Sequence, residues 1–200
     1  MSAAAVEHPC DGKPPTLLDE AERLAERNPG YRIEILGGVI TVTPPPDGPH
    51  GLSLTDLTFA FAPLHGGGSH VIQGIGLWLP SGPYDFAVPD LAVVDADFRD
   101  HLIENNCYSP DVFRMALEVT SSNYNSDLKI KVAAYANAKI PVYVIVDRKH
   151  ERLHVLQDPL ANEYGQHRLY APGEQATLPG SIGDAEVTLD VAAILEAAHP

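Results

Sequence analysis

Two short apolar runs, each carrying one carboxylate, constrain this chain more than any other feature of its sequence. Residues 88–95 have the sequence VPDLAVVD and residues 116–122 have the sequence ALEVTSS, so Asp90 and Glu118 each lie in a run typical of a buried strand. A carboxylate buried alone is very costly, so each must be paired, exposed at a strand end or bound to a cation. Both could still end their strands facing water.

A shared positive partner is expected if the two strands are neighbours. Mg²⁺ prefers oxygen ligands and is commonly held by one or two carboxylates, so Asp90 and Glu118 suggest a hard-metal site and phosphoryl-transfer chemistry. Side chains alternate along a strand, which places Asp90 on the face of Ala92 and Val94, and Glu118 on the face of Ala116. These small or slim neighbours leave room beside each carboxylate.

A helix predicted directly after the second run adds a lysine. Asp127, Lys131 and Tyr135 are spaced four residues apart and share one stripe, whereas Lys129 falls on nearly the opposite side. Only one of the two lysines can therefore face the carboxylates, and the stripe that starts at Asp127 favours Lys131. An ordinary surface ion pair between Asp127 and Lys131 is the competing interpretation.

Length and composition indicate one α/β domain over residues 16–200, preceded by a mobile arm over residues 1–15. The chain has 200 residues with 44% hydrophobic and 20% charged residues, which are globular values, and its 18 prolines and 16 glycines predict many turns. The pattern predicts helices at 16–27, 49–64, 122–138 and 190–198, and strands at 31–36, 39–43, 71–79, 90–94, 113–119, 142–147, 152–157, 164–170 and 185–189.

The charge distribution is uneven. A net charge of −14 argues against a protein that coats nucleic acid through bulk electrostatics, but six of the 13 basic residues lie between Lys129 and Arg152. That segment could form a local basic surface that meets a polyanion, or it could be ordinary solvated charge on a helix and a hairpin.

The chain shows no sign of export or of a membrane span. Its first 15 residues have no apolar leader, and Cys10 and Cys107 have no CxxC partner, which favours the cytoplasm and argues against structural zinc. No apolar run approaches the roughly 20 residues needed to cross a bilayer.

Other motifs carry less chemistry. The glycines between His65 and His70 lack the setting of a phosphate loop, Ser121 has no nucleophile-elbow context, and no histidine pair has zinc-protease spacing. His50, at a helix start, could approach the carboxylates or could be structural.

The motifs taken together resemble the Uma-type family of endonucleases, within the PD-(D/E)XK nuclease superfamily. The resemblance covers about residues 17 to 195. It rests on VPDL at 88–91, ALEVTS at 116–121, Lys131 in the following helix, IPVYVIVD at 140–147, and YRIEILGG at 31–38, which is similar to the family's opening hairpin. It implies a restriction-endonuclease-like mixed sheet flanked by helices.

The resemblance also implies roles for individual residues. Asp90 and Glu118 would hold Mg²⁺ or Mn²⁺, the Val119 carbonyl would be a further ligand, and Glu34 would complete the site as an orienting group or an outer ligand. Lys131 would stabilise the transition state or position the attacking water. The superfamily's usual lysine position falls on Thr120, so Lys131 takes that role from the helix instead.

The expected function is therefore metal-dependent hydrolysis of DNA phosphodiester bonds, and the resemblance suggests a homodimer. The alternative is a catalytically silent nucleic-acid-binding or protein-interaction module on the same fold. The net charge of −14 favours the alternative, whereas the retention of four charged groups favours the enzyme. These groups are Glu34, Asp90, Glu118 and Lys131.

Overall fold

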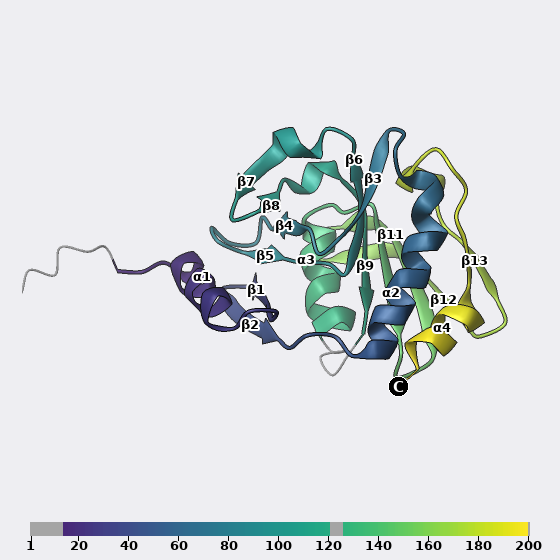
Figure 1. Cartoon of the computed structure of the whole chain (residues 1–200). Helices are drawn as coiled ribbons and strands as arrows, with labels where there is room; N and C mark the ends of the chain where they lie inside the picture. The colour runs from purple at the N-terminus through teal and green to yellow at the C-terminus, as the bar shows by residue number, and fades with distance from the viewer. Residues whose placement is uncertain (1–13, 121–125, 200) are drawn as a thin grey trace, which may run out of the picture.

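The computed structural model describes residues 14–120 and 126–199 of the chain, with the side chains of residues 126 and 127 left aside. Two six-stranded mixed sheets and a two-stranded ribbon, with helices packed against them, make up these residues (Figure 1). The predicted α/β class and the mixed sheet flanked by helices are confirmed.

The first large sheet has the order β2-β1-β5-β4-β8-β7, the second has the order β12-β11-β10-β9-β6-β3, and the ribbon pairs β13 with β14. The helices are α1 (Leu17–Arg27), α2 (Gly48–Phe61), α3 (Lys131–Asn137) and α4 (Val191–Ala198). The strands are β1 (Arg32–Leu36), β2 (Val39–Thr43), β3 (Ser69–Gln73), β4 (Gly76–Trp78), β5 (Phe86–Ala87), β6 (Leu91–Asp95), β7 (Leu102–Glu104), β8 (Cys107–Tyr108), β9 (Phe113–Val119), β10 (Val142–Asp147), β11 (Arg152–Leu160), β12 (Glu163–Tyr170), β13 (Gln175–Thr177) and β14 (Thr188–Asp190).

The second sheet brings the two carboxylate-bearing runs side by side. Strands β6 and β9 are antiparallel with Leu91 opposite Leu117 and Ala92 opposite Ala116, so Asp90, one residue before β6, lies at the level of Glu118. Strand β10 continues on the far side of β9 in a parallel pairing. The two carboxylate-bearing strands are therefore neighbours, as expected.

Alternation divides the second sheet between two hydrophobic cores. Leu91 and Leu117 face a core closed by α2 and α4, whereas Ala92 and Ala116 face a core closed by α3. Figure 1 shows α2 and α4 on one side of this sheet and α3 on the other. Glu118 has the parity of Ala116, so it projects toward α3, the element that carries the lysine.

The N-terminal hairpin of the first sheet lies opposite the carboxylate-bearing strands of the second sheet. Strands β1 and β2 pair across Gly37 and Gly38, which both adopt positive φ, as a two-residue hairpin turn requires. Helix α1 begins with a capping box between Thr16 and Asp19 and packs on the face of β1 that carries Ile33 and Ile35. The other face of β1, with Arg32 and Glu34, is left to meet the second sheet.

Some predicted elements were wrong in extent. The predicted strand at 71–79 is two strands in different sheets, because the chain turns at Gly74 (φ 63°), whose amide donates to the Asp90 carbonyl. Strands β5, β7, β8 and β13 were missed, since two or three residues give too short an alternating pattern. The predicted helix at 122–138 begins outside the described residues; its described part is a π-helical turn, Ser126–Ile130, followed by α3.

The part of the chain that the structure describes contains no helix with both the length and the apolar character needed to cross a bilayer. Most of the expected N-terminal arm lies outside the described residues.

A histidine lies in the same row of the second sheet as Glu118. Glu118 pairs with Ile145, and Ile145 pairs with His154. His154 Nδ1 lies 3.0 Å from His167 Nε2, and His154 Nε2 lies 3.5 Å from Asp147 Oδ2. Burial, followed by the neighbouring His167, lowers the pKa of His154 despite the opposing effect of Asp147.

This lowered pKa predicts a loss of stability on mild acidification. The unfolded chain takes up the His154 proton near pH 6.5, while the folded protein resists it, so the free energy of unfolding should fall as pH drops below about 6.5. The substitution His154→Leu should flatten this dependence in urea unfolding followed from pH 7.5 to pH 5, whereas the exposed His101→Leu should leave it unchanged. Identical slopes in His154→Leu and the unsubstituted protein would contradict the assignment.

Candidate active site: a buried carboxylate cluster

The four charged residues singled out in the sequence lie together in the interior. Glu34 comes from β1, Asp90 precedes β6, Glu118 lies on β9 and Lys131 is the first residue of α3. Their exposed fractions are 3%, 4%, 2% and 3%, so all four are buried. Neither carboxylate of the second sheet faces water, and the strand-end alternative is excluded for both.

Lys131 joins the two glutamates. Its Nζ lies 3.0 Å from Glu34 Oε1 and 2.9 Å from Glu118 Oε1. One turn further along α3, the Tyr135 hydroxyl donates to the same Glu118 oxygen at 2.8 Å. Burial, and then the charge of Glu118, raise the pKa of Tyr135 well above its ordinary value, which keeps that hydroxyl protonated as a donor.

Lys129 is exposed and does not take part in this arrangement. The i, i+4 stripe thus placed Lys131 and Tyr135 on the correct side of the helix. The side chain of Asp127, where the stripe was expected to begin, lies outside the described residues.

Arg32 forms a second bridge that the sequence analysis missed. Its Nη2 hydrogen-bonds Asp90 Oδ1, and its Nη1 lies 3.5 Å from Glu118 Oε2 while donating to the Val88 carbonyl at 3.0 Å. The signal was available, because Arg32 stands two residues before Glu34 and must share its face of β1. An arginine at the start of a strand is, however, usually a surface residue.

Asp90 is held from two further directions. The Val119 amide donates to its Oδ2 at 2.8 Å, and His50 Nε2 lies 3.4 Å from the same oxygen. His50 is buried in the first turn of α2, where its amide donates to the capping Asp47 side chain. Burial raises the pKa of Asp90, but His50, Arg32 and the Val119 amide outweigh it and lower the pKa well below its ordinary range.

The remaining positions fix the shape of the cluster. The Val88 amide donates to Glu34 Oε1 at 2.8 Å, which ties β1 to the chain just before Asp90. Thr120, at the superfamily's usual lysine position, accepts a hydrogen bond from the Arg148 amide. Val119 contacts the cluster through its N–H; its carbonyl as a metal ligand stays a prediction.

The donor set suits a hard cation. Asp90 Oδ1 and Glu118 Oε2 both face one guanidinium, so a positive charge already lies between two carboxylates on adjacent strands. Within residues 14–120 and 126–199, no three His, Cys, Asp or Glu side chains are arranged to hold a metal, and Arg32 and Lys131 lie among the carboxylates. Asp90 and Glu118 are the two carboxylates on adjacent strands that could hold a divalent cation.

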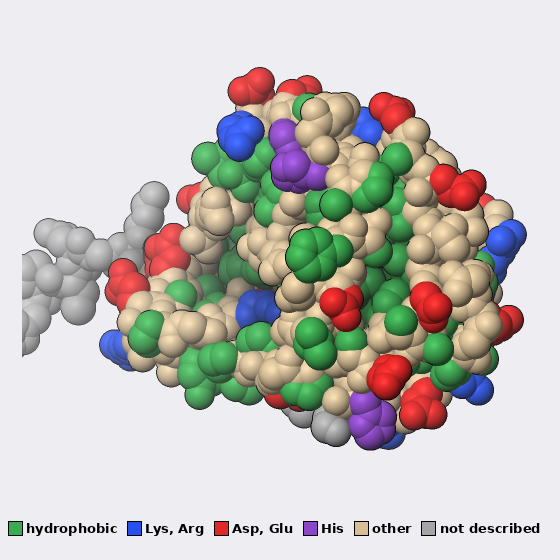
Figure 2. All heavy atoms as spheres, turned by 45° about the vertical axis from the view of Figure 1, so that its right-hand side comes forward, with side chains coloured by type: hydrophobic (Ala, Val, Ile, Leu, Met, Phe, Trp, Pro, Cys, Tyr) green, Lys and Arg blue, Asp and Glu red, His purple; other side chains and the backbone are tan. Residues whose placement is uncertain are grey.

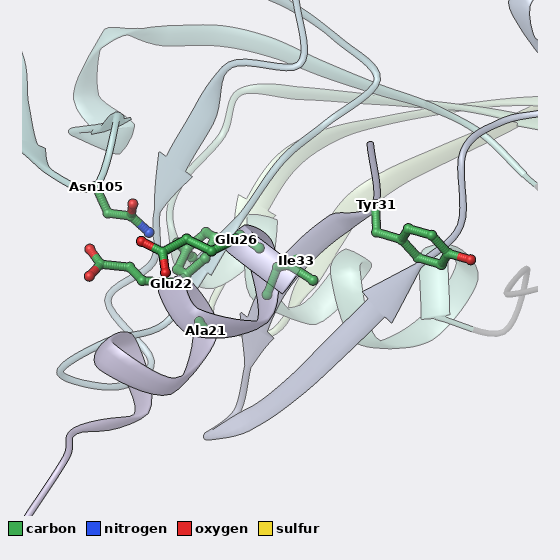
Figure 3. A pocket seen from close by; sticks show the side chains of 8 residues that line it. Ala21, Glu22, Glu26, Tyr31, Ile33 and Asn105 are labelled. Atoms are coloured by element: carbon green, nitrogen blue, oxygen red, sulfur yellow. The ribbon is translucent and has the colours of Figure 1, made fainter. Parts of the chain in front are cut away.

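A cavity in the described part of the chain is separate from this cluster. It has a volume of about 350 Å³ and lies between α1 and β1, lined by Ala21, Glu22, Ala25, Glu26, Tyr31, Ile33, Phe86 and Asn105. Figure 3 shows Glu22, Glu26 and Asn105 close together at the edge of this cavity. Strand β1 therefore separates the cavity from Arg32 and Glu34 on its other face.

The basic surface predicted between Lys129 and Arg152 has fewer exposed cations than the sequence suggested. Two of its six members are turned inward: Lys131 is in the cluster, and Arg148 donates to the Ala198 carbonyl at 2.6 Å and lies 3.1 Å from Asp47. Figure 2 shows acidic side chains scattered over one face of the molecule, with basic ones between them.

Paired carboxylates on neighbouring strands, with a lysine held against them on a mixed sheet flanked by helices, define a restriction-endonuclease-like protein. The chain belongs to the Uma2 family, whose model, described as "Putative restriction endonuclease", matches residues 18–192. This confirms the resemblance seen in the sequence.

A solved structure has the same fold. It is a crystal structure from Anabaena variabilis, described as "a putative nuclease belonging to DUF820", with 13% sequence identity and a TM-score of 0.59. The match covers 82% of this chain and 90% of that one. No curated protein matches the chain.

The cluster predicts that replacing either of two neighbouring lysines has very different effects on the free energy of unfolding. Lys131→Met removes the ammonium that bridges two buried carboxylates, Glu34 and Glu118, which should lower the free energy of unfolding by about 3–5 kcal/mol. The matched control Lys129→Met removes an exposed charge and should change it by less than about 0.5 kcal/mol. Urea unfolding in EDTA measures both, and equal values would contradict the buried bridge.

Proposed function

We propose that this protein is a divalent-metal-dependent endonuclease that hydrolyses phosphodiester bonds in DNA. One observation carries the proposal: Asp90 and Glu118 lie side by side on adjacent strands, buried, with Lys131 fixed against Glu118. Membership of a family described as restriction endonucleases supports a nucleic-acid substrate.

Asp90 and Glu118 would hold Mg²⁺ or Mn²⁺. The ion supplies Lewis acidity, lowering the pKa of a bound water and neutralising charge on the phosphoryl group. The chain's own residues orient this pair: the Val119 amide donates to Asp90 Oδ2, which His50 approaches at 3.4 Å, while Lys131 and Tyr135 hold Glu118 Oε1.

Lys131 would act on the reacting phosphodiester as well as on Glu118. A buried ammonium beside the carboxylates can stabilise negative charge that develops in the transition state or can position the attacking water. Glu34 is a positioning residue, because it acts through Lys131, which it contacts at 3.0 Å.

The alternative is a non-cleaving nucleic-acid-binding or protein-interaction module. The net charge of −14 and the existing neutralisation of the carboxylates by Arg32 and Lys131 favour it. A binding module, however, has no need of a lysine and two carboxylates that converge out of contact with solvent, since buried charges contribute little to affinity for a polyanion.

A homodimer acting in the cytoplasm is part of the proposal. Two copies of one site are needed to cut both strands of a duplex in a single encounter, so light scattering should give twice the chain mass. A dimer should also convert supercoiled plasmid directly to linear product, whereas a monomer should accumulate nicked circles first.

Cleavage of supercoiled plasmid with Mg²⁺ or Mn²⁺ tests the activity. Asp90→Asn and Glu118→Gln should lose both Mn²⁺ binding and at least about 100-fold in cleavage rate, because each removes a proposed ligand. Lys131→Met, assayed below its unfolding temperature, should keep Mn²⁺ binding and lose cleavage.

Lys129→Met serves as the control and should cleave normally, since Lys129 lies outside the cluster. Equal activity in all four variants would remove the proposed site. Metal-independent binding of the plasmid without any cleavage would favour the binding module, and cleavage of RNA alone would change the substrate class.

A further inference from the structure

One guanidinium lies where the proposed metal ligands converge. Arg32 hydrogen-bonds Asp90 Oδ1 and approaches Glu118 Oε2 at 3.5 Å, so it spans the two carboxylates from adjacent strands. Although burial lowers the pKa of Arg32, Asp90, Glu118 and Glu34 raise it above its ordinary value, so the side chain stays charged.

The cluster divides the oxygens of each carboxylate into two sets. Asp90 Oδ2 accepts from the Val119 amide and faces His50, while its Oδ1 faces Arg32. Glu118 Oε1 is held by Lys131 and Tyr135, while its Oε2 faces Arg32. One oxygen of each pair is therefore anchored by surrounding structure, and the other is directed at the guanidinium.

A divalent ion and the guanidinium cannot share these two oxygens. An ion such as Mg²⁺ binds its oxygen ligands at about 2.0–2.1 Å. An ion bound between these two oxygens would therefore lie where the guanidinium of Arg32 now lies. Two cations so close in a poorly hydrated site would also repel each other strongly. Occupation by one therefore requires departure of the other.

Arg32 is the cation that can depart. Its side chain is 23% exposed, whereas the side chains of Asp90 and Glu118 are 2% exposed and that of Lys131 is 3% exposed. It stands at the first position of β1 with a long side chain that can reach solvent. The Lys131 side chain is enclosed and paired with the anchored Glu118 oxygen, so it has no comparable route to solvent.

We propose that Arg32 occupies the divalent-metal position of the resting protein and competes with the metal for Asp90 and Glu118. This inference rests on the proposed function, because it concerns the same metal ligands. Arg32 keeps the carboxylates neutralised and the fold stable without metal, at the expense of weaker metal affinity.

Mn²⁺ binding to the full-length protein, measured by isothermal titration calorimetry after EDTA treatment, tests the competition. Arg32→Gln should bind Mn²⁺ at least about tenfold more tightly than the unsubstituted protein, because the competing charge is gone. Arg23→Gln, which removes an exposed arginine paired with Glu20 on α1, makes the same change in net charge and should leave the affinity unchanged. Glu118→Gln should abolish binding.

Thermal unfolding provides a second readout. In EDTA, Arg32→Gln should melt below the unsubstituted protein, since it leaves Asp90 and Glu118 without their shared cation. Saturating Mn²⁺ should raise its melting temperature by more than it raises that of the unsubstituted protein, because tighter binding stabilises more. Should Arg32→Gln fail to fold in EDTA, Arg32→Lys provides the test, with an Mn²⁺ affinity above that of the unsubstituted protein, because one ammonium cannot span both carboxylates.

The outcomes separate this inference from the proposed function. Equal Mn²⁺ affinity of Arg32→Gln and the unsubstituted protein, with Glu118→Gln still deficient, would overturn the competition and leave the metal site intact. Tight Mn²⁺ binding by Arg32→Gln without plasmid cleavage by the unsubstituted protein would support the competition while counting against the nuclease.

Discussion

The rest of this structure depends on how a buried group of carboxylates is neutralised. Glu34, Asp90 and Glu118 are almost fully enclosed, and unpaired carboxylates in such a place would destabilise the fold severely. Lys131 and Arg32 prevent this by bridging them in two pairs. Because these five residues come from both large sheets and from α3, the same interactions hold the N-terminal hairpin against the second sheet.

This arrangement connects stability with the proposed chemistry. Lys131 and Tyr135 fix one oxygen of Glu118, and the Val119 amide fixes one oxygen of Asp90, so the carboxylates are oriented before any ligand arrives. Preorganised groups of this kind require little rearrangement during a reaction. The oxygens that face Arg32 are the ones available for exchange between an internal cation and an external one.

The acidic body of the protein agrees with a site that is neutralised internally. Two of the basic residues that the sequence places in a single segment, Lys131 and Arg148, are occupied by contacts within the fold. An encounter of this segment with a polyanion would therefore rely on the four basic residues that remain exposed, Lys129, Lys139, Lys149 and Arg152.

The amino-acid sequence by itself determined the residues that lie close in the chain or repeat with a regular period. Alternation placed Asp90 on the face of Ala92 and Glu118 on the face of Ala116, and the four-residue period of the helix placed Lys131 and Tyr135 on one stripe. Only the tertiary structure paired β6 with β9 and so brought the two carboxylates together. The family resemblance added Glu34. Only the tertiary structure decided that Arg32 and His50 join the cluster, because they come from β1 and α2 and meet Asp90 through contacts between distant parts of the chain. Periodicity puts Arg32 on the same face of β1 as Glu34, but it does not determine what that face meets, since such contacts follow from how whole sheets and helices pack.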